Sequence, residues 1–211
     1  MADNLVLALA NLQEEDAMRI VKERLASGED PLTILADART AMEMVGKKFS
    51  DCEYFIPDLV YSGEILSQIA ALTKSRVSKE AQLKRLGKCV IGTVATDIHD
   101  IGKNIVGFML DVNGFDVIDI GVDVPAEKFV EAIKQAKPEV VALSGFLTSC
   151  FDEMKKTVEA IDAAGLRNKV KIMIGGGQID EHVSKHAKAD GWGNDAMQAV
   201  KLAKQWVGAK K

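Results

Sequence analysis

Cysteine is scarce in this sequence and poorly placed for a structural role. The 211 residues include only three cysteines, Cys52, Cys89 and Cys150, and none of them belongs to a Cys-x-x-Cys pair. Because the number is odd and the spacings are wide, the pattern predicts neither a disulfide framework nor a zinc ribbon. Free cysteines are typical of reducing compartments, so we expect a cytoplasmic protein.

Long apolar runs and a surplus of positive charge are also absent. No apolar run reaches the roughly 18 residues that a membrane helix needs, and the N-terminus does not resemble a signal peptide. Acidic residues outnumber basic ones by 31 to 27, for a formal net charge of −4. We therefore expect no membrane segment and no nucleic-acid partner. The composition, with 47% hydrophobic and 27% charged residues, is that of an ordinary globular protein of one or two domains.

The first part of the chain carries only helical signals. Pro31 is suited to the first position of a helix, and apolar residues then recur at three- and four-residue steps as far as Phe49. Pro57 begins another such helix, and two shorter apolar stretches precede Pro31. These segments predict a four-helix bundle over residues 1–86, of which the polar residues 74–86 form a linker.

The pattern changes at Gly87, after which short apolar runs alternate with helical stretches. The runs are typical of buried strands and lie at residues 89–94, 115–120, 140–143 and 170–174. The helical stretches lie at about 103–113, 126–136, 152–164 and 195–207. This alternation predicts a doubly wound, Rossmann-like α/β domain over residues 87–211, with a parallel sheet covered by helices on both faces.

Ligands of such sheets bind beyond the carboxyl ends of the strands, so the residues that follow each strand carry the functional signal. His99 follows the first strand, and a neutral imidazole is the commonest side-chain metal ligand. Asp97 is placed to accept a hydrogen bond from the other ring nitrogen, which would fix the tautomer. Gly102 and the glycines at 175–177 would let a ligand approach the backbone closely. Together these residues predict a ligand site at one edge of the sheet.

Simpler interpretations of the same residues exist. A lone loop histidine is usually only a polar surface residue, Asp97 could cap the next helix, and glycines after a strand can form a tight turn. A dinucleotide fingerprint fails because its third glycine falls on Asp180, and a receiver-type phosphoacceptor fails because the third strand ends in Ser144. A zinc site built on His182 and His186 stays open as an alternative, with His99 or Cys150 as a further ligand, although no HExxH glutamate lies between the two histidines.

The strand-end residues also carry a family resemblance. Asp97-x-His99-x-x-Gly102, followed by Ser144 and by Gly175-Gly176, resembles the DxHxxG…SxL…GG signature of cobalamin-binding domains. Residues 97–107, 121–128 and 143–148 look very like the cobalamin domain of methionine synthase, and Val45-Gly46-x-x-Phe49 with Phe55-Ile56-Pro57 resembles its helical cap. The likeness covers nearly the whole chain. It is similar to the free-standing corrinoid proteins of methyltransferase systems for methanol, methylamines, methoxylated aromatics or glycine betaine.

The resemblance implies a cofactor and its site. The cofactor would be cobalamin or a related corrinoid (methylcobalamin or cob(I)alamin), bound base-off. His99 would be the lower axial ligand of cobalt and Asp97 its hydrogen-bond partner, and these two would be the catalytic residues. The rest of the cofactor site would comprise Asp100, Ile101, Gly102, Ser144, Phe146, Thr148, Gly175, Gly176 and Gly177, with Phe49 and Ile56 over the upper face.

Two positions depart from the family pattern. Phe146 replaces the leucine of SxL, which changes the shape expected of the channel for the cofactor's tail. Cys150 stands where a hydroxyl residue continues the His–Asp relay in methionine synthase, and a thiol is a weaker hydrogen-bond partner. Ser149 is an alternative third member of that relay.

The resemblance also implies a function. The chain would carry a methyl group on cobalt from a substrate-specific methyltransferase to a second methyltransferase, with a tetrahydrofolate or a thiol as acceptor, and would need a reductive activator. It would not be catalytic on its own. The cap would swing aside about a hinge at residues 75–86. The alternatives are the cobalamin-binding subunit of an adenosylcobalamin mutase, which the helical first half disfavours, and a cobalamin-dependent sensor, which lacks its usual basic DNA-binding segment here.

Overall fold

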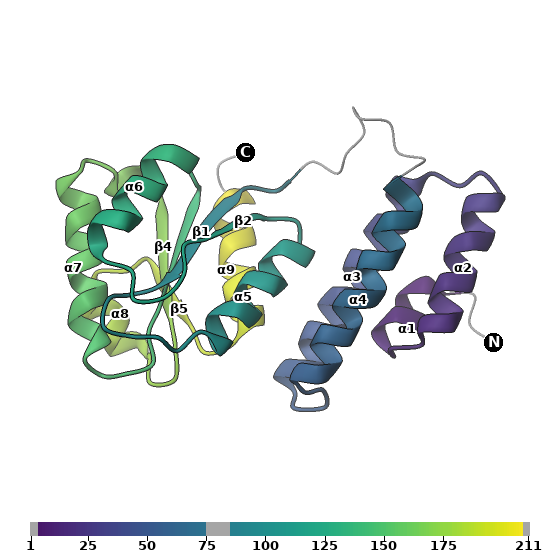
Figure 1. Cartoon of the computed structure of the whole chain (residues 1–211), viewed down its shortest axis with the longest axis horizontal. Coiled ribbons are helices and arrows are strands. Elements are labelled where there is room, and N and C mark those ends of the chain that lie inside the picture. The colour runs from purple at the N-terminus through teal and green to yellow at the C-terminus, as the bar shows by residue number, and fades with distance from the viewer. Residues whose placement is uncertain (1–3, 75–84, 209–211) are drawn as a thin grey trace. The chain divides into compact units, whose positions relative to one another are not determined.

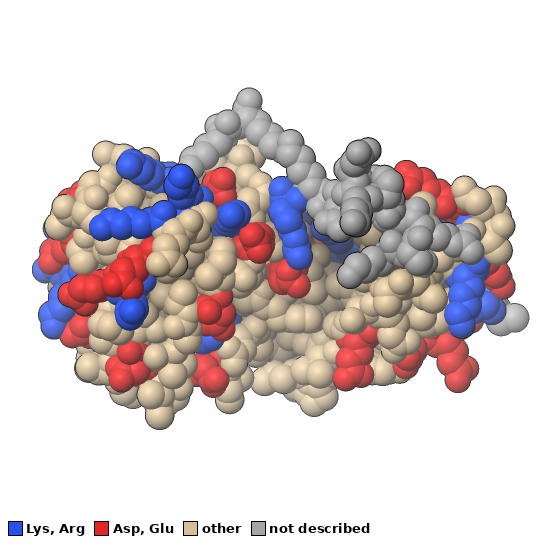
Figure 2. Space-filling view, turned by 45° about the horizontal axis from the view of Figure 1, so that its top comes forward, with Lys and Arg blue, Asp and Glu red and all other residues tan. Residues whose placement is uncertain are grey.

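The computed structural model describes residues 4–74 and 85–208 (Figure 1). The chain divides into two compact units, Met1–Lys84 and Arg85–Lys211. Most of the linker expected at 74–86, and with it the hinge expected at 75–86, lies outside the described residues. On the face that Figure 2 shows, basic and acidic side chains are interspersed, in keeping with the near balance of 27 basic and 31 acidic residues.

Within its described part, the first unit consists of the four helices that the apolar stripes predict. They are α1 (Leu5–Ala10), α2 (Glu14–Ala26), α3 (Pro31–Ser50) and α4 (Ile56–Lys74). The Asn4 side chain accepts hydrogen bonds from the first amides of α1, and α3 begins at Pro31 as expected. Apolar side chains from all four helices are fully buried between them, including Leu9, Ile20, Met42 and Ile69. The prediction of a helical bundle is confirmed.

The second unit is a five-stranded parallel sheet in the order β2-β1-β3-β4-β5. The elements in chain order are β1 (Lys88–Thr93), α5 (Ile101–Val112), β2 (Asp116–Asp119), α6 (Ala126–Ala136), β3 (Val140–Ser144), α7 (Cys150–Ala163), η2 (Arg167–Lys169), β4 (Lys171–Gly175), α8 (Glu181–Ala187), β5 (Gly191–Gly193) and α9 (Ala196–Gly208). The doubly wound fold is confirmed, with a short fifth strand and the helix α8 in addition to the elements that the sequence predicts.

Helices cover both faces of the sheet. α5 and α9 pack against each other on one face, and α6, α7 and α8 form a row on the other (Figure 1). The row closes over the main core, in which Phe129, Met154 and Ile172 are fully buried. This packing leaves the loops at the carboxyl ends of the strands as the open edge of the unit.

Candidate functional site

Loops from three neighbouring strands meet at the carboxyl edge of the sheet. The strand ends are level, because Thr93 of β1 pairs with Ser144 of β3, which pairs with Gly175 of β4. The loops continue this pairing, since the amide of Val94 donates to the Ser144 carbonyl at 3.0 Å. β1 and β3 flank the point where the strand order reverses, which is the usual ligand site of such sheets. The structure therefore brings the residues singled out after the three strands to one place.

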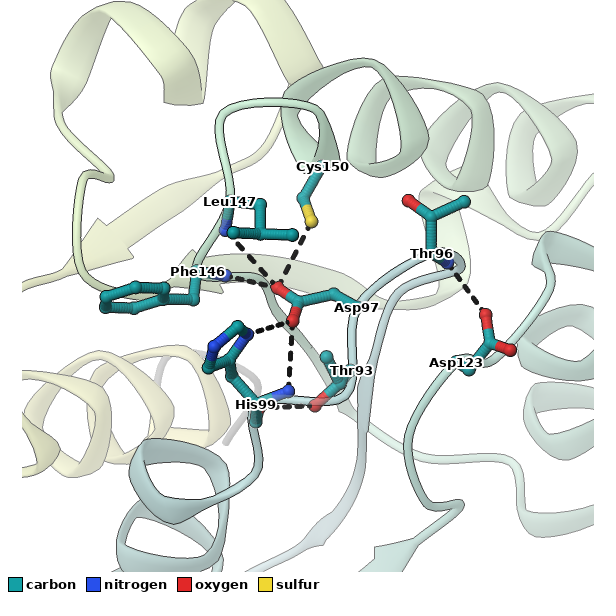
Figure 3. Close-up of polar contacts among 8 residues, drawn as sticks. All are labelled: Thr93, Thr96, Asp97, His99, Asp123, Phe146, Leu147 and Cys150. Atoms are coloured by element: carbon teal, nitrogen blue, oxygen red, sulfur yellow. Dashed lines mark hydrogen bonds and ion pairs between the residues drawn. The ribbon is translucent and has the colours of Figure 1, made fainter.

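Asp97 and His99 form a bonded pair in the loop after β1. His99 Nδ1 lies 2.5 Å from Asp97 Oδ1, and the same oxygen accepts the His99 backbone amide at 3.0 Å (Figure 3). The Asp97 side chain has no exposed surface, whereas 52% of the His99 side chain is exposed. With Nδ1 committed to the buried carboxylate, Nε2 on the other edge of the ring is the atom available to a ligand.

The second carboxylate oxygen of Asp97 is held by the loop after β3. It accepts the amide of Phe146 at 2.5 Å, the amide of Leu147 at 3.4 Å and the thiol of Cys150 at 3.2 Å (Figure 3). Burial by itself would raise the pKa of Asp97, but the hydrogen bonds from Phe146, His99 and Cys150 outweigh it and hold that pKa well below its ordinary value. Asp97 is therefore a fixed negative charge behind the imidazole.

Cys150 is the third member of the chain of hydrogen bonds that begins at His99. Burial, and then the neighbouring charge of Asp97, raise the pKa of the Cys150 thiol to about 11. The thiol consequently stays protonated near neutral pH and donates a hydrogen bond to the carboxylate. The sequence leaves open whether Cys150 or Ser149 follows Asp97, and the structure places Cys150 there, buried at the start of α7.

Glycines of the loop after β4 fit against the loop after β3. Gly176 has a φ of +147°, and a Cβ at that position would lie 1.8 Å from the carbonyl oxygen of Gly145. A Cβ at Gly177 would lie 2.5 Å from the ring of Phe146, which in turn stands 4.7 Å from the His99 ring, centroid to centroid. Packing inside the protein thus accounts for these two glycines. Gly102 differs, because a Cβ there would meet nothing within 4 Å.

Comparison with known proteins identifies the arrangement. Residues 87–201 match the family model of a B12 binding domain, and residues 1–73 match a second B12 binding domain model. The trimethylamine corrinoid protein of Methanosarcina barkeri is 39% identical over 201 residues, which cover 93% of this chain and 93% of that protein. This chain belongs to the B12-binding corrinoid protein family.

Solved structures agree with this membership. A cobalamin-binding protein from Desulfitobacterium hafniense DCB-2 superposes with a TM-score of 0.82 at 36% identity and covers 97% of each chain. The methanol:cobalamin methyltransferase complex of Methanosarcina barkeri contains a chain that superposes with a TM-score of 0.80 at 26% identity, over 97% of this corrinoid protein and 78% of that chain. Both matches extend through the helical unit as well as the α/β unit.

The remaining predicted site residues of the corrinoid protein lie around this centre or in the other unit. Asp100 accepts a hydrogen bond from Asn104 at 3.1 Å, and Ile101 is 66% exposed at the start of α5. Ser144 is half-buried at the end of β3, Thr148 is exposed in the loop that follows, and Gly175 closes β4. Phe49 and Ile56 belong to the helical unit, in the last turn of α3 and at the first residue of α4, and their place over the cofactor stays a prediction.

The zinc alternative has no support in residues 4–74 and 85–208. His182 and His186 both lie on α8, but His186 Nε2 pairs with Asp152 at 2.9 Å. No group of three or more His, Cys, Asp or Glu side chains that could hold a metal ion occurs among those residues. Asp180, where a dinucleotide fingerprint would need glycine, instead caps α8 by accepting the amide of Val183. None of the helices described there is long and apolar enough to span a membrane.

Sequence inspection missed the backbone donors of the site. The amides of Phe146 and Leu147 hold the charge of Asp97, but every residue except proline carries such an amide. Only the three-dimensional path of the loop after β3 aims them at the carboxylate. No side-chain pattern could have revealed them.

Acid is predicted to remove the stability that Asp97 contributes. Because its folded pKa lies below its ordinary value, Asp97 stabilises the fold above about pH 4, and that contribution is lost as the pH falls through the folded pKa. The advantage of the wild type over Asp97→Asn in free energy of unfolding should shrink as the pH falls from about 4 toward the folded pKa of Asp97. Urea unfolding of the cofactor-free protein, followed by Trp192 and Trp206 in the α/β unit, measures this. An advantage that does not change with pH would contradict the assignment.

Two glycine variants should behave oppositely in the same unfolding assay. Gly176→Ala forces a Cβ into the Gly145 carbonyl at a φ unfavourable for alanine, so we expect a loss of at least roughly 1–3 kcal/mol in free energy of unfolding. Gly102→Ala is the matched control, because it meets open space within helix α5 and should leave the stability unchanged or slightly raised. Equal destabilisation by both variants would contradict the packing of the two loops.

Proposed function

We propose that this chain is the methyl-carrying corrinoid protein of a methyltransferase system. It accepts a methyl group from a substrate-specific methyltransferase and delivers it to a second methyltransferase, whose acceptor is a tetrahydrofolate or a thiol. The observation that carries the proposal is His99, half-exposed at the switch point of the sheet and backed by the buried charge of Asp97. A trimethylamine corrinoid protein and a methanol:cobalamin methyltransferase complex are among its relatives, which supports a methyltransferase as partner.

The surroundings of His99 suit a large, flat and largely apolar ligand. Apart from Leu86, every exposed large hydrophobic residue described in the α/β unit lies at this edge, in its loops or at the start of α5, namely Ile98, Ile101, Val122, Phe146 and Leu147. Exposed apolar side chains gathered at one place mark a binding surface. A corrinoid would find there an apolar surface with one free imidazole nitrogen, so the residues present match the cofactor of the family.

The proposal gives each residue a task. His99 Nε2 would hold the cobalt in place of the cofactor's own lower base, with Asp97 holding Nδ1. Gly102, Ser144, Thr148 and Gly175 would line the path of the tail, beside the packed glycines Gly176 and Gly177. Phe49 and Ile56 of the helical unit would shield the methyl-bearing face. When bound, the corrinoid supplies a cobalt centre that can accept and donate a methyl group, and the protein supplies orientation and electrostatics.

Proton movement in this scheme is confined to His99. When its Nε2 is not needed as a ligand, the imidazole can take up a proton there, and the fixed charge of Asp97 stabilises the imidazolium. Asp97 does not take the proton itself, because its hydrogen bonds keep its pKa low. The Cys150 thiol, with its raised pKa, remains a donor throughout. The pair thus supports both the ligated and the released state of the histidine.

The helical unit favours a methyl carrier over the mutase alternative. The match to the trimethylamine corrinoid protein covers 93% of both chains, so it includes this unit. A reductive activator of the corrinoid completes the proposed set of partners.

The first test is reconstitution with hydroxocobalamin, followed by absorption spectroscopy. We expect the wild type to bind one equivalent, and His99→Ala to show a changed axial-ligand spectrum and an affinity weaker by about tenfold or more. His182→Ala, which removes an exposed histidine of α8, is the matched control and should behave as the wild type. A wild type that binds no corrinoid would contradict the proposed function. Unchanged spectra in His99→Ala would contradict the ligand assignment alone.

A second test uses Gly102, whose open surroundings separate folding from binding. A Cβ at this position would meet nothing within 4 Å in the protein itself. Gly102→Val should therefore keep the thermal stability of the cofactor-free protein within a few degrees, because its Cβ lies in open space, while weakening hydroxocobalamin binding about tenfold. Binding as tight as that of the wild type would show that the corrinoid does not approach Gly102.

A further inference from the structure

Two residues beside the His99 loop adopt a backbone conformation that is uncommon for their type. Thr96 has a φ of +69° and Asp123 a φ of +51°. Left-handed backbone is uncommon outside glycine; asparagine, aspartate and histidine adopt it more often than other residues, and for a β-branched threonine it is a true outlier. The amide of Asp97 donates to the Val94 carbonyl at 3.3 Å, so Thr96 is the third residue of a turn, a position that glycine or asparagine usually takes when φ is positive.

The two residues are bonded to each other and to Asp97. The amide of Thr96 donates to Asp123 Oδ1 at 2.7 Å (Figure 3), and the amide of Asp123 donates to the backbone carbonyl of Asp97 at 2.9 Å. Both distances lie within the ordinary range of N–H···O hydrogen bonds. Asp123 therefore bonds to the turn at two points, with its side chain at the Thr96 amide and with its backbone at the Asp97 carbonyl.

The loop that carries Asp123 is firmly attached to β1. The amide of Thr93 donates to the Gly121 carbonyl at 3.0 Å, and the amide of Val124 donates back to the Thr93 carbonyl at 3.0 Å. Val124 is 4% exposed and belongs to the main core. Asp123 itself is exposed, so its side chain adds nothing to the core. The contact that depends on an aspartate side chain at this position is the hydrogen bond from the Thr96 amide to Oδ1.

The strained turn decides where the Asp97 carboxylate lies. One of its oxygens must reach His99, and the other must reach the amide of Phe146 on a different loop, at 2.5 Å in both cases. Thr96 immediately precedes Asp97, so its backbone conformation sets the direction from which the Asp97 side chain reaches these two partners. We propose that Asp123 is a positioning residue, which holds Thr96 in the left-handed conformation and thereby sets Asp97 and His99 for ligation of the corrinoid. This inference rests on the proposed function only in its last step.

Two substitutions of Asp123 separate its carboxylate from its backbone. Asp123→Asn keeps an acceptor oxygen and tolerates the positive φ, whereas Asp123→Gly loses the acceptor without adding strain. In hydroxocobalamin titrations, Asp123→Asn should stay within about twofold of the wild-type affinity. Asp123→Gly should lose about tenfold, since unsupported strain of this kind is worth roughly that factor. Its absorption spectrum should also shift toward that of His99→Ala.

A rescue experiment tests whether the strain at Thr96 is the cause. Thr96→Gly added to Asp123→Gly should recover about half or more of the lost affinity on a logarithmic scale, because glycine adopts a positive φ at no steric cost. Thr96→Ala is the matched control and should recover clearly less than Thr96→Gly, because alanine still pays the Cβ penalty of the left-handed conformation. Equal recovery by both, or none by glycine, would overturn the proposal.

Two readouts on the same variants distinguish positioning from general stability. In the cofactor-free protein, hydrogen exchange of the Thr96 amide should be at least about tenfold faster in Asp123→Gly, with little change in melting temperature. If affinity instead falls only in step with melting temperature, and the bound spectrum stays that of the wild type, Asp123 is merely structural and the proposal fails. The exchange result does not depend on a corrinoid. If the wild type binds no corrinoid, the proposed function is wrong, but hydrogen exchange of the Thr96 amide still tests whether Asp123 stabilises the turn.

Discussion

The buried charge of Asp97 is the constraint on which the site depends. An ionised carboxylate inside a protein must be fully hydrogen-bonded, because otherwise its removal from water costs several kcal/mol. Here the imidazole and amide of His99 hold one oxygen, and the loop after β3 holds the other. The carboxylate consequently links the loops that follow two adjacent strands, β1 and β3, and this link fixes the position of the histidine.

The other loops at this edge of the sheet pack around the hydrogen-bonded Asp97. The backbone of Gly145 lies against Gly176, and the ring of Phe146 fills the space between Gly177 and His99. On the opposite side, the loop of Asp123 holds the turn before Asp97. Each loop thus contacts a neighbouring loop, and these contacts between loops fix the geometry around His99. Preorganisation of this kind lets a ligand bind without first ordering its site.

Local patterns were sufficient to predict most of the fold and the chemical centre of the site. Apolar stripes marked α3 and α4, strand-like runs marked β1 to β4, and Asp97 with His99 lie only two residues apart. β5 was missed because its three residues, Gly191–Gly193, include two glycines and make no apolar run. The hydrogen bond between Thr96 and Asp123 was missed because a positive φ at threonine has no sequence signal, and the two positions are 27 residues apart.

The contrast in exposure between His99 and Asp97 suits the two ligation states that we propose for the histidine. The atom that binds and releases cobalt in our proposal belongs to a side chain that is 52% exposed, while the compensating charge belongs to one with no exposed surface. A proton can therefore reach the histidine from solvent without disturbing the carboxylate. Had Asp97 been exposed, water would weaken its hold on Nδ1, and had His99 been buried, no large ligand could reach its Nε2. The loops around the pair maintain this separation, which is why residues as remote in sequence as Gly176 and Asp123 belong to the same site.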